Sequence, residues 1–381
     1  MNRSVLAENS SEFSLHDAEW KIFVEKDIPV TVFLAVLSVA GTFGNVSVIL
    51  TVGRCDRWSN YRVLIQCLAL VDFLSCAFSI PGYIALSRFR FTIESDTLCR
   101  GTTMFHIFVG AFSVDLLCFI SIERFRKTCR PFGKQFNLKH TKIVCACLSG
   151  FNIALATLGL FTFSVQDIRV GTLTGHTCRI NKEGTFAKIF SQILSTLLFL
   201  KIVMCTILYS IVGKTILLQR RKRPKMASFK SQNSRRMSTL SGQLKDKERS
   251  SKEINGCRTE RLSSKSVSSF EQSSASQMNG SKRQMCSNLK GKALYTKSAQ
   301  ISFMFLMCTF LSFLSFVPVL VIRCVESFDW HLREDMFEYL GPMAGIFYRF
   351  HVMNHVINPI VYCLTNSSFR RDCTDLCKCR S

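Results

Sequence analysis

The sequence predicts an all-α membrane protein, a seven-transmembrane helix bundle followed by a short amphipathic helix on the cytoplasmic side. Three observations predict this fold. The 381-residue chain contains seven predominantly apolar stretches, each reaching the length of about 18 residues that crosses a bilayer as a helix. Lysine and arginine gather in alternate connections between these stretches. Several stretches also carry acidic or amide side chains, which are costly in hydrocarbon and therefore mark functional positions.

Each span must be a helix, because backbone polar groups in lipid have to be satisfied within the segment. The spans are expected at residues 29–53, 63–87, 97–123, 141–165, 187–218, 298–323 and 338–363. The domain organisation follows as an N-terminal tail at 1–28, spans one to five within 29–219, a basic loop at 220–297, spans six and seven within 298–363, and the amphipathic helix with the tail at 364–381.

The loop at 220–297 is strongly basic and has no apolar period. Residues 214–297 hold 21 Lys and Arg against 5 Asp and Glu, a surplus of 16 within the net charge of +23. Low hydrophobicity with high charge predicts a disordered segment. Basic blocks also bind nucleic acid, but the flanking spans favour a cytoplasmic loop and no nucleic-acid partner. Ser238, after Arg235-Arg236-Met237, is a candidate phosphorylation site.

The charge distribution also predicts the orientation, since Lys and Arg near span ends stay in the cytoplasm. Basic residues mark the connections one–two and three–four and the C-terminal tail, at Arg54, Arg57, Arg62, Arg124, Arg126, Lys127, Arg130, Lys134, Lys139, Lys142, Arg370, Arg371, Lys378 and Arg380. We therefore expect a multi-pass plasma-membrane protein with its N-terminus outside. Asn2 and Asn9 match the glycosylation pattern there.

Most of the 18 cysteines lie inside the spans, where a cysteine is a small apolar filler. Two differ in position. Cys99 opens the third span and Cys178 lies in the loop before the fifth, and an oxidising exterior permits their pairing. Three more, Cys373, Cys377 and Cys379, follow the seventh span, where juxtamembrane cysteines are candidates for palmitoylation.

Three motifs together carry a family resemblance. Glu123-Arg124-Phe125 ends the third span, the pentapeptide Asn358-Pro359-Ile360-Val361-Tyr362 ends the seventh, and Asp72 follows Leu68-Ala69-Leu70-Val71 in the second. This combination resembles the rhodopsin-like (class A) family of G-protein-coupled receptors over about residues 29 to 378, apart from the basic loop. The chain resembles the peptide-binding members most, as a divergent example.

The resemblance implies a disulfide between Cys99 and Cys178, because the family has its first cysteine 25 residues before the arginine of the third span. It also implies a set of activation-switch residues, namely Glu123, Arg124, Phe125, Tyr209, Phe316, Pro318, Asn358, Pro359 and Tyr362. In the family, the arginine turns toward the transducer on activation. On its own, Arg124 also fits an interfacial anchor. The acid that locks this arginine in many relatives would fall at Ser298, so measurable basal activity is expected.

Four residues match positions that gather around the acid of the second span, Asp72, namely Asn45, Ser113, Asn354 and Asn358. Together with Asp72 they resemble the sodium pocket of the family. A sodium ion is thus the one cofactor expected. The alternative is that Asp72 is a polar packing residue satisfied by water. Phe369 followed by Arg370 and Arg371 resembles the start of the family's short interfacial helix.

Several residues depart from the family pattern. Phe316 stands where a Trp is usual, Ser312 replaces a core Phe, and Lys201 stands where the fifth span usually has a Pro. An ammonium in mid-span is costly unless it snorkels or pairs.

Two residues that particular ligand classes require in the family are absent from this sequence. His106 occupies the position where amine receptors need an Asp, and Val352 occupies the position where opsins need a Lys. Residues 166–188 alternate around a Thr-Gly turn, which predicts a β-hairpin of the kind typical of peptide receptors. The ligand-pocket candidates are His106, Phe316, Arg323 and Arg349. Acidic outer segments favour a cationic peptide by steering, whereas Arg88, Arg90, Arg323 and Arg349 favour a ligand carboxylate, and the sequence leaves both open.

The resemblance therefore implies a receptor, without enzymatic activity, that binds an extracellular neuropeptide or peptide hormone and activates a heterotrimeric G protein. Arrestin, receptor kinases and membrane lipids are the other expected partners. The alternatives are a receptor for a small molecule or lipid, a non-signalling scavenger, and a membrane transporter, although no internal repeat of the kind that builds transporters is found.

Overall fold

The computed structural model describes residues 14–54, 58–170, 173–181, 185–253, 298–326, 336 and 338–378. The chain divides into two compact units. The first comprises Met1–Ser210 with Ser302–Ser381, and the second comprises Ile211–Ile301. The helical bundle belongs to the first unit.

The chain enters the first span through a helix that the sequence analysis treated as part of a tail. α1 (Leu15–Ile22) begins after Ser14, whose hydroxyl accepts the Asp17 amide at 3.2 Å while the Asp17 carboxylate accepts the Ser14 amide. This reciprocal capping satisfies free amides of the first turn. A π-helical turn, Phe23–Asp27, continues into α2 (Ile28–Gly53). The predicted tail is therefore helical after Ser14.

The second span is one helix with a widened turn in its middle. It consists of α3 (Asn60–Leu74), a π-helical turn (Ser75–Ser79) and α4 (Ile80–Arg88). Pro81 has no amide hydrogen to donate, so the regular hydrogen-bond ladder is interrupted at this point. The third span is α5 (Asp96–Cys129).

The fourth span is shorter than predicted. α6 (Leu138–Leu158) and a 3₁₀ turn (Gly159–Phe161) are followed by the antiparallel strands β1 (Phe163–Val170) and β2 (Leu173–Ile180). Residues 163–165, which the analysis placed in the span, are in β1 because their backbone groups pair with β2.

The β-hairpin is present, but its turn differs from the predicted one. Val170 pairs with Leu173, so the chain reverses between these residues, and Thr174-Gly175 lies inside β2. A Cβ atom at Gly175 would overlap the carbonyl oxygen of Phe91. The glycine therefore permits a close approach of two backbone segments and is not needed for the turn.

The fifth span continues far beyond the predicted boundary. α7 (Thr185–Glu253) contains the span and then residues 220–253, which the sequence analysis assigned to a disordered loop. This part of the prediction is wrong for the backbone. Lys, Arg and Gln are good helix formers, and a helix that is already nucleated extends without a new nucleus. Residues 254–297 lie outside the described residues.

The sixth span is the helix Ser298–Glu326, and six helices of the described residues are long and apolar enough to cross a membrane. The seventh predicted span is divided into α10 (Pro342–Arg349), a 3₁₀ turn (Phe350–Met353) and α11 (Asn354–Thr365). Gly341, with φ of 53°, separates α10 from the residues before it. The stretch is helical, but it is not one continuous helix.

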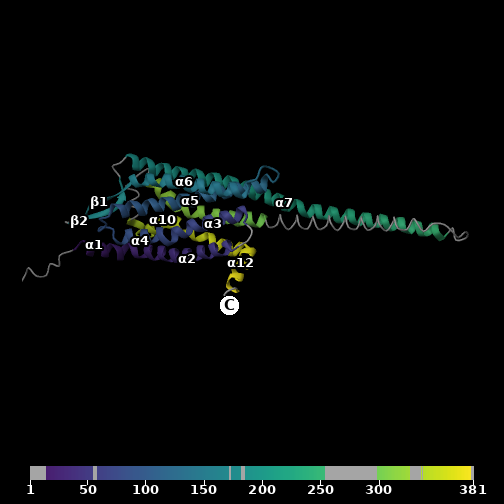
Figure 1. Ribbon diagram of the computed structural model, residues 1–381, viewed down its shortest axis with the longest axis horizontal. Coiled ribbons are helices and arrows are strands. Elements are labelled where there is room, and N and C mark those ends of the chain that lie inside the picture. The colour runs from purple at the N-terminus through teal and green to yellow at the C-terminus, as the bar shows by residue number, and fades with distance from the viewer. Residues whose placement is uncertain are drawn as a thin grey trace, which may run out of the picture. The chain divides into compact units, whose positions relative to one another are not determined.

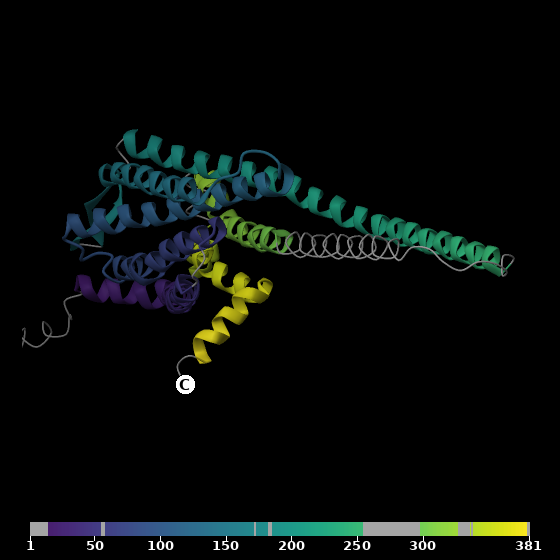
Figure 2. The same cartoon turned by 45° about the vertical axis from the view of Figure 1, so that its right-hand side comes forward.

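Within the first unit, α2 packs against α3 and α11, and α5 packs against α3 and α6. Figures 1 and 2 show these helices side by side. α1, β1 and β2 gather at one end, called here the hairpin end, and α12 (Ser367–Lys378) lies at the other and crosses the direction of α2. The predicted amphipathic helix after the seventh span is therefore present.

The bundle is apolar outside and partly polar inside. On α2, Val32, Val36, Val39 and Phe43 are each more than half exposed, whereas Asn45 is fully buried. The exposed positions repeat every three or four residues, which is one face of a helix. An apolar outer face and a polar inner face fit lipid as the surroundings, so the membrane bundle predicted from the sequence is confirmed.

Candidate functional site

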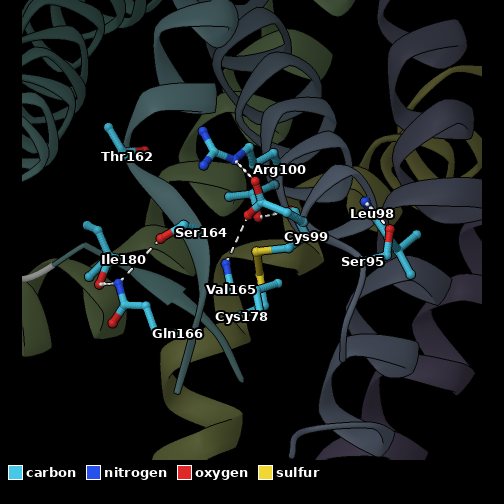
Figure 3. Close-up of a disulfide and its surroundings, with 12 residues drawn as sticks. Ser95, Leu98, Cys99, Arg100, Thr162, Ser164, Val165, Gln166, Cys178 and Ile180 are labelled. Carbon is cyan, nitrogen blue, oxygen red and sulfur yellow. Dashed lines mark hydrogen bonds and ion pairs between the residues drawn. A yellow bond between two sulfur atoms is a disulfide. The ribbon is translucent and has the colours of Figure 1, made fainter. Parts of the chain in front are cut away.

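A disulfide fixes the β-hairpin to the start of α5. Cys99, in the first turn of α5, is bonded to Cys178 on β2, with Cα atoms 5.5 Å apart (Figure 3). Next to it, the Asp96 carboxylate accepts the Val165 amide at 3.0 Å and Nε of Arg100 at 2.5 Å. The predicted pairing is therefore formed, and it holds the hairpin across the end of the bundle.

Two arginines that the sequence offered as ligand anchors are already paired within the chain. Arg88 lies 3.5 Å from the carboxylate of Glu19, a buried residue of α1. Arg90 donates to both carboxylate oxygens of Asp27 at 2.8 and 2.9 Å. These pairs attach the N-terminal helix to the segment after α4, so the arginines serve the fold at the hairpin end.

The other two candidate arginines differ from each other. Arg323 pairs with Glu326 at 3.0 Å and donates to the Tyr348 hydroxyl at 2.5 Å. Arg349 has only long contacts, 3.5 Å to the hydroxyl of Ser87 and 3.4 Å to a backbone carbonyl, and its buried Nε has no partner. Among the described residues, no carboxylate lies within ion-pair distance of Arg349.

Arg349 lines a cavity of about 500 Å³ at the hairpin end, called here the outer cavity. Its walls come from α4, α5, α10 and both strands, through Tyr83, Leu86, Ser87, Arg90, Phe91, Thr103, Phe163, Ile168, Thr177, Cys178, Arg179 and Arg349. The described wall holds three arginines and no acid. The volume lies in the range of pockets that bind drug-sized ligands.

A second cavity, of about 20 Å³, lies deeper and shares Tyr83 and Arg349 with the outer cavity. It contains two histidines that face each other. His106 Nδ1 is 2.9 Å from the Ser79 hydroxyl, and its Nε2 is 3.4 Å from Nε2 of His351. The structure thus places His106 in a cavity wall, as the sequence analysis expected, and adds His351 as its partner.

His351 links this inner cavity to the sixth span. Its ring stacks on that of Phe316, with centroids 5.9 Å apart and planes at 24°. Phe316 is 6% exposed and lies two residues before Pro318 in the helix Ser298–Glu326. Tyr83, His106, His351 and Phe316 therefore form a continuous line of aromatic rings from the outer cavity toward the sixth helix.

A buried polar cluster surrounds Asp72 in the middle of the bundle. Its Oδ1 accepts the Ser113 hydroxyl at 3.1 Å and lies 2.7 Å from Nδ1 of His355. Its Oδ2 accepts the Asn358 amide at 2.7 Å, and Asn354 donates to Ser113 at 3.0 Å. We call these five residues the Asp72 cluster.

One predicted member of this cluster bonds elsewhere, and one actual member was missed. Asn45 donates to the backbone carbonyls of Gly41 and His355, both at 2.9 Å, and not to the acid. His355 could have been found, because an ionisable residue inside a span marks a functional position. Sodium binding here stays a prediction. The side chain of Pro359, next to Asn358 of the cluster, lies against Gly44 on α2.

A second buried polar group ties the third, fourth and fifth spans together. Lys201 Nζ lies 2.6 Å from Asp115 Oδ1, and Asn152 donates to Asp115 Oδ2 at 2.8 Å. A lysine in mid-span needs a partner, as expected from the sequence. The identity of that partner, Asp115, could not be predicted, because the rotation of each helix decides which side chains face each other.

Arg124 is buried at the end of α5 that lies away from the hairpin. It is 2% exposed, pairs with its neighbour Glu123, and has its guanidinium 5.4 Å from the ring centroid of Phe305 on the sixth span. Lys127 holds the other Glu123 oxygen at 2.6 Å. These four residues, called here the Arg124 cluster, join the third and sixth helices. Phe125 packs under the Arg130 guanidinium, 5.9 Å away.

The two predicted switch tyrosines are buried. Tyr209 accepts the Thr309 hydroxyl at 3.3 Å. Tyr362 packs edge-on against Phe369 at 6.0 Å, and its hydroxyl has no partner among the described residues. No hydrogen bond joins the two tyrosines in the described part of the chain.

Of the predicted modification sites, only Cys373 has a described side chain, and its Sγ lies 3.3 Å from the Thr51 hydroxyl. Five further positions lie outside the described side chains: Asn2, Asn9, Ser238, Cys377 and Cys379. Ser238 falls on the backbone of α7. All of these modifications stay predictions.

Comparison with known proteins places this geometry in a family. The sequence model described as "7 transmembrane receptor (rhodopsin family)" matches residues 44–362. The chain is 23% identical over 361 residues to cholecystokinin receptor type A of Cavia porcellus, covering 92% of this chain and 80% of that receptor. It is 30% identical over 134 residues to a putative neuropeptide Y receptor type 6 of Homo sapiens, covering 35% and 46%, respectively.

A further alignment to neuropeptide Y receptor type 6 of Mus musculus has 27% identity over 107 residues, covering 28% of this chain and 29% of that receptor. The matched part thus spans less than half the length of both neuropeptide Y receptors. The family match is much longer and includes both the Asp72 cluster and the Arg124 cluster. Its members are receptors and not enzymes. The chain therefore belongs to the rhodopsin family of seven-transmembrane receptors.

Proposed function

We propose that this chain is a plasma-membrane receptor, with its N-terminus outside, that binds an extracellular peptide and activates a heterotrimeric G protein. One observation carries the proposal. The outer cavity adjoins the inner cavity through Tyr83 and Arg349, and the inner cavity ends at His351, which stacks on Phe316 of the sixth helix. A ligand in the outer cavity can therefore act through His351 and Phe316 on the sixth helix, which also contributes Phe305 to the Arg124 cluster.

The peptide ligand is supported by three features. Two strands form a hairpin beside the cavity, a form typical of peptide-binding members, and the disulfide holds it in place. The outer cavity accommodates a few terminal residues of a peptide at about 500 Å³. The similar proteins carry the names neuropeptide Y receptor and cholecystokinin receptor.

The charge of the cavity favours an acidic group on the part of the peptide that enters it. Arg179 and Arg349 line the cavity, and among the described residues neither has a carboxylate partner, whereas Asp27 already neutralises Arg90. A carboxylate between two guanidinium groups gains charge-assisted hydrogen bonds. Of the two ligand charges that the sequence left open, we therefore favour a carboxylate in the cavity.

Activation follows from a shift between two states of the bundle. In the described state, Glu123 holds Arg124 inside, against Phe305. A ligand that moves His351 changes the packing of Phe316 and so the position of the sixth helix. Moving that helix removes Phe305 from Arg124, which then becomes available to the G protein.

A ligand screen tests this proposal. The expressed receptor is exposed to peptides made in pairs, with a free C-terminal carboxylate and with an amide, while calcium and cyclic AMP are read together. We expect a response to carboxylate peptides that Arg124→Ala abolishes. Arg349→Gln should reduce potency about 10- to 100-fold, because a hydrogen bond to a charged group is worth about 1.5–3 kcal/mol.

Arg169→Gln is the matched control, since Arg169 is exposed on the same hairpin and does not line the cavity. Equal potency losses in both variants would remove the case for Arg349 as a ligand contact. The absence of any peptide response, with surface expression confirmed, would favour a lipid or small-molecule ligand.

A further inference from the structure

Sodium binding at the Asp72 cluster can be judged from the donors that surround the carboxylate. A cation needs direct contact with a carboxylate lone pair, and an ionised carboxyl group offers about four such sites. Three are occupied by hydrogen-bond donors, two on Oδ1 from Ser113 and His355 and one on Oδ2 from Asn358. Both sites on Oδ1 are therefore occupied, and one site on Oδ2 is left.

His355 is the donor that separates a cation from Oδ1 of Asp72. An ionised carboxylate only accepts hydrogen bonds, so when Asp72 is ionised the ring nitrogen 2.7 Å from Oδ1 carries a hydrogen. The imidazole is then a donor at the oxygen that a cation would contact. Asp72 is 0% exposed and His355 is 2% exposed, so the ring has no solvent-filled space into which it can move.

The backbone holds His355 in this position. Its carbonyl oxygen accepts the Asn45 side-chain amide from α2 at 2.9 Å, and the residues on either side of it, Asn354 and Val356, are also buried. A cation that displaced the ring would leave a buried imidazole nitrogen without its partner, which is costly.

The cluster and the neighbouring Asn45 also contain acceptors without a donor. The side-chain oxygens of Asn45, Asn354 and Asn358 are buried and unpaired among the described atoms. Buried water satisfies polar groups of this kind. Neutral amide oxygens do not supply the negative charge that draws sodium into a protein interior, and the carboxylate that does supply it has its Oδ1 occupied.

We infer that the side chain of His355 takes the place of a cation at Asp72, so that this receptor does not bind sodium at the Asp72 cluster. The sodium site expected from the family resemblance is thereby replaced by a histidine–aspartate contact. The inference does not depend on the identity of the ligand or on G-protein coupling.

Thermal unfolding of the purified full-length receptor in detergent tests the inference without any ligand. The midpoint is measured in sodium chloride and in choline chloride at equal ionic strength. The wild type should show no sodium-specific shift. His355→Ser frees one lone pair of Oδ1 and adds a hydroxyl oxygen, so it should gain a sodium-specific rise of about 2–4 °C when sodium is well above its Kd.

The rise should disappear in the double variant His355→Ser with Asp72→Asn. His351→Ser is the matched control, because it removes an imidazole from the same span without touching Asp72. If His355→Ser does not fold, His355→Ala frees the same lone pair. A sodium-specific shift in the wild type that Asp72→Asn removes would overturn the inference. The absence of a shift in a folded His355 variant would show that the histidine is not what excludes sodium.

Discussion

At the scale of single residues, the buried charged side chains in the described part of the chain each meet a partner of opposite charge or a hydrogen-bond donor. Glu123 and Arg124 are 1% and 2% exposed and adjacent in sequence. Because Glu123 supplies the negative charge that keeps Arg124 inside, the acid that many relatives place on the sixth helix is replaced here by a local pair and by the ring of Phe305.

This arrangement predicts the effect of Glu123→Gln. Removing the carboxylate weakens the hold on Arg124 without changing its size, so the ligand-free activity of the receptor should rise several-fold. Nucleotide exchange on a G protein in membranes, measured without ligand, checks this. Lys127→Gln is the control, since it removes a charge at the same acid but leaves the Glu123–Arg124 pair. Unchanged basal exchange in Glu123→Gln would mean that Arg124 is held by packing alone.

At the scale of elements, polar contacts decide which helices adjoin. The Lys201–Asp115 pair and the Asn152 amide connect α7, α5 and α6 inside the bundle. Lys201 is 22% and Asp115 is 10% exposed at the side chain, so both are largely desolvated and each depends on the other. Gly41 contributes in a different way, because a Cβ there would overlap Sγ of Cys76, and its absence lets α2 approach the second span.

The ion pair predicts a non-additive mutant series. Asp115→Asn leaves a lysine unpaired in mid-bundle and should lower the unfolding free energy by about 3 kcal/mol, since breaking a buried pair costs that much or more. Asp115→Leu combined with Lys201→Leu should recover most of the loss. Thermal unfolding in lipid nanodiscs measures the cycle. Additive losses in the double variant would show that the two residues act independently.

The disulfide predicts a local effect at the hairpin end. Cys99→Ser with Cys178→Ser opens a loop between residues 79 apart in sequence, and loss of such a link costs about 4 kcal/mol in the chain-entropy account. We expect a lower unfolding midpoint and faster proteolysis within β1 and β2. Cys324→Ser is the control, because Cys324 is an exposed free thiol. Equal proteolysis of the two variants would show that Asp96 and the strand contacts suffice to hold the hairpin.

At the scale of the whole molecule, the apolar surface has to match lipid while the polar groups face inward. The outer side of α2, with Val39 at 58% exposure near its middle, is apolar and exposed. The same chain exposes Phe132 completely, at 102%, but in the connection after α5. Both side chains are apolar and largely exposed. Val39 lies in the middle of a predicted membrane span, whereas Phe132 lies in a connection outside the spans.

This difference predicts the outcome of two lysine substitutions. Val39→Lys should oppose insertion by about 2.5–3.5 kcal/mol, the value for a charge at the centre of a span, and should lower the amount of receptor at the cell surface. Phe132→Lys should leave surface expression unchanged or improved. Quantitative surface labelling of both variants measures this. Similar expression of Val39→Lys and wild type would mean that this face of α2 does not contact lipid.

The sequence by itself determined the helical spans, the amphipathic helix and the hairpin, because each depends on local apolar length or on local pattern. The resemblance to the receptor family implied the Cys99–Cys178 pair. Arg124 and Asp72 were predicted as functional positions, since charges in a span are rare. It missed the helix before the first span and the continuation of α7 to Glu253, where propensity and capping outweighed composition.

Only the tertiary structure decided which buried groups meet. Asp72 and His355 are 283 residues apart in sequence, and Asp115 and Asn152 are 37 apart. Such contacts depend on how each helix is rotated about its axis and shifted along it. When a span is apolar on every side, its apolar pattern does not determine either quantity. The packing of the helices places His355 against Oδ1 of Asp72. It also places the arginines in the wall of the outer cavity, because only packing fixes which face of a helix points inward.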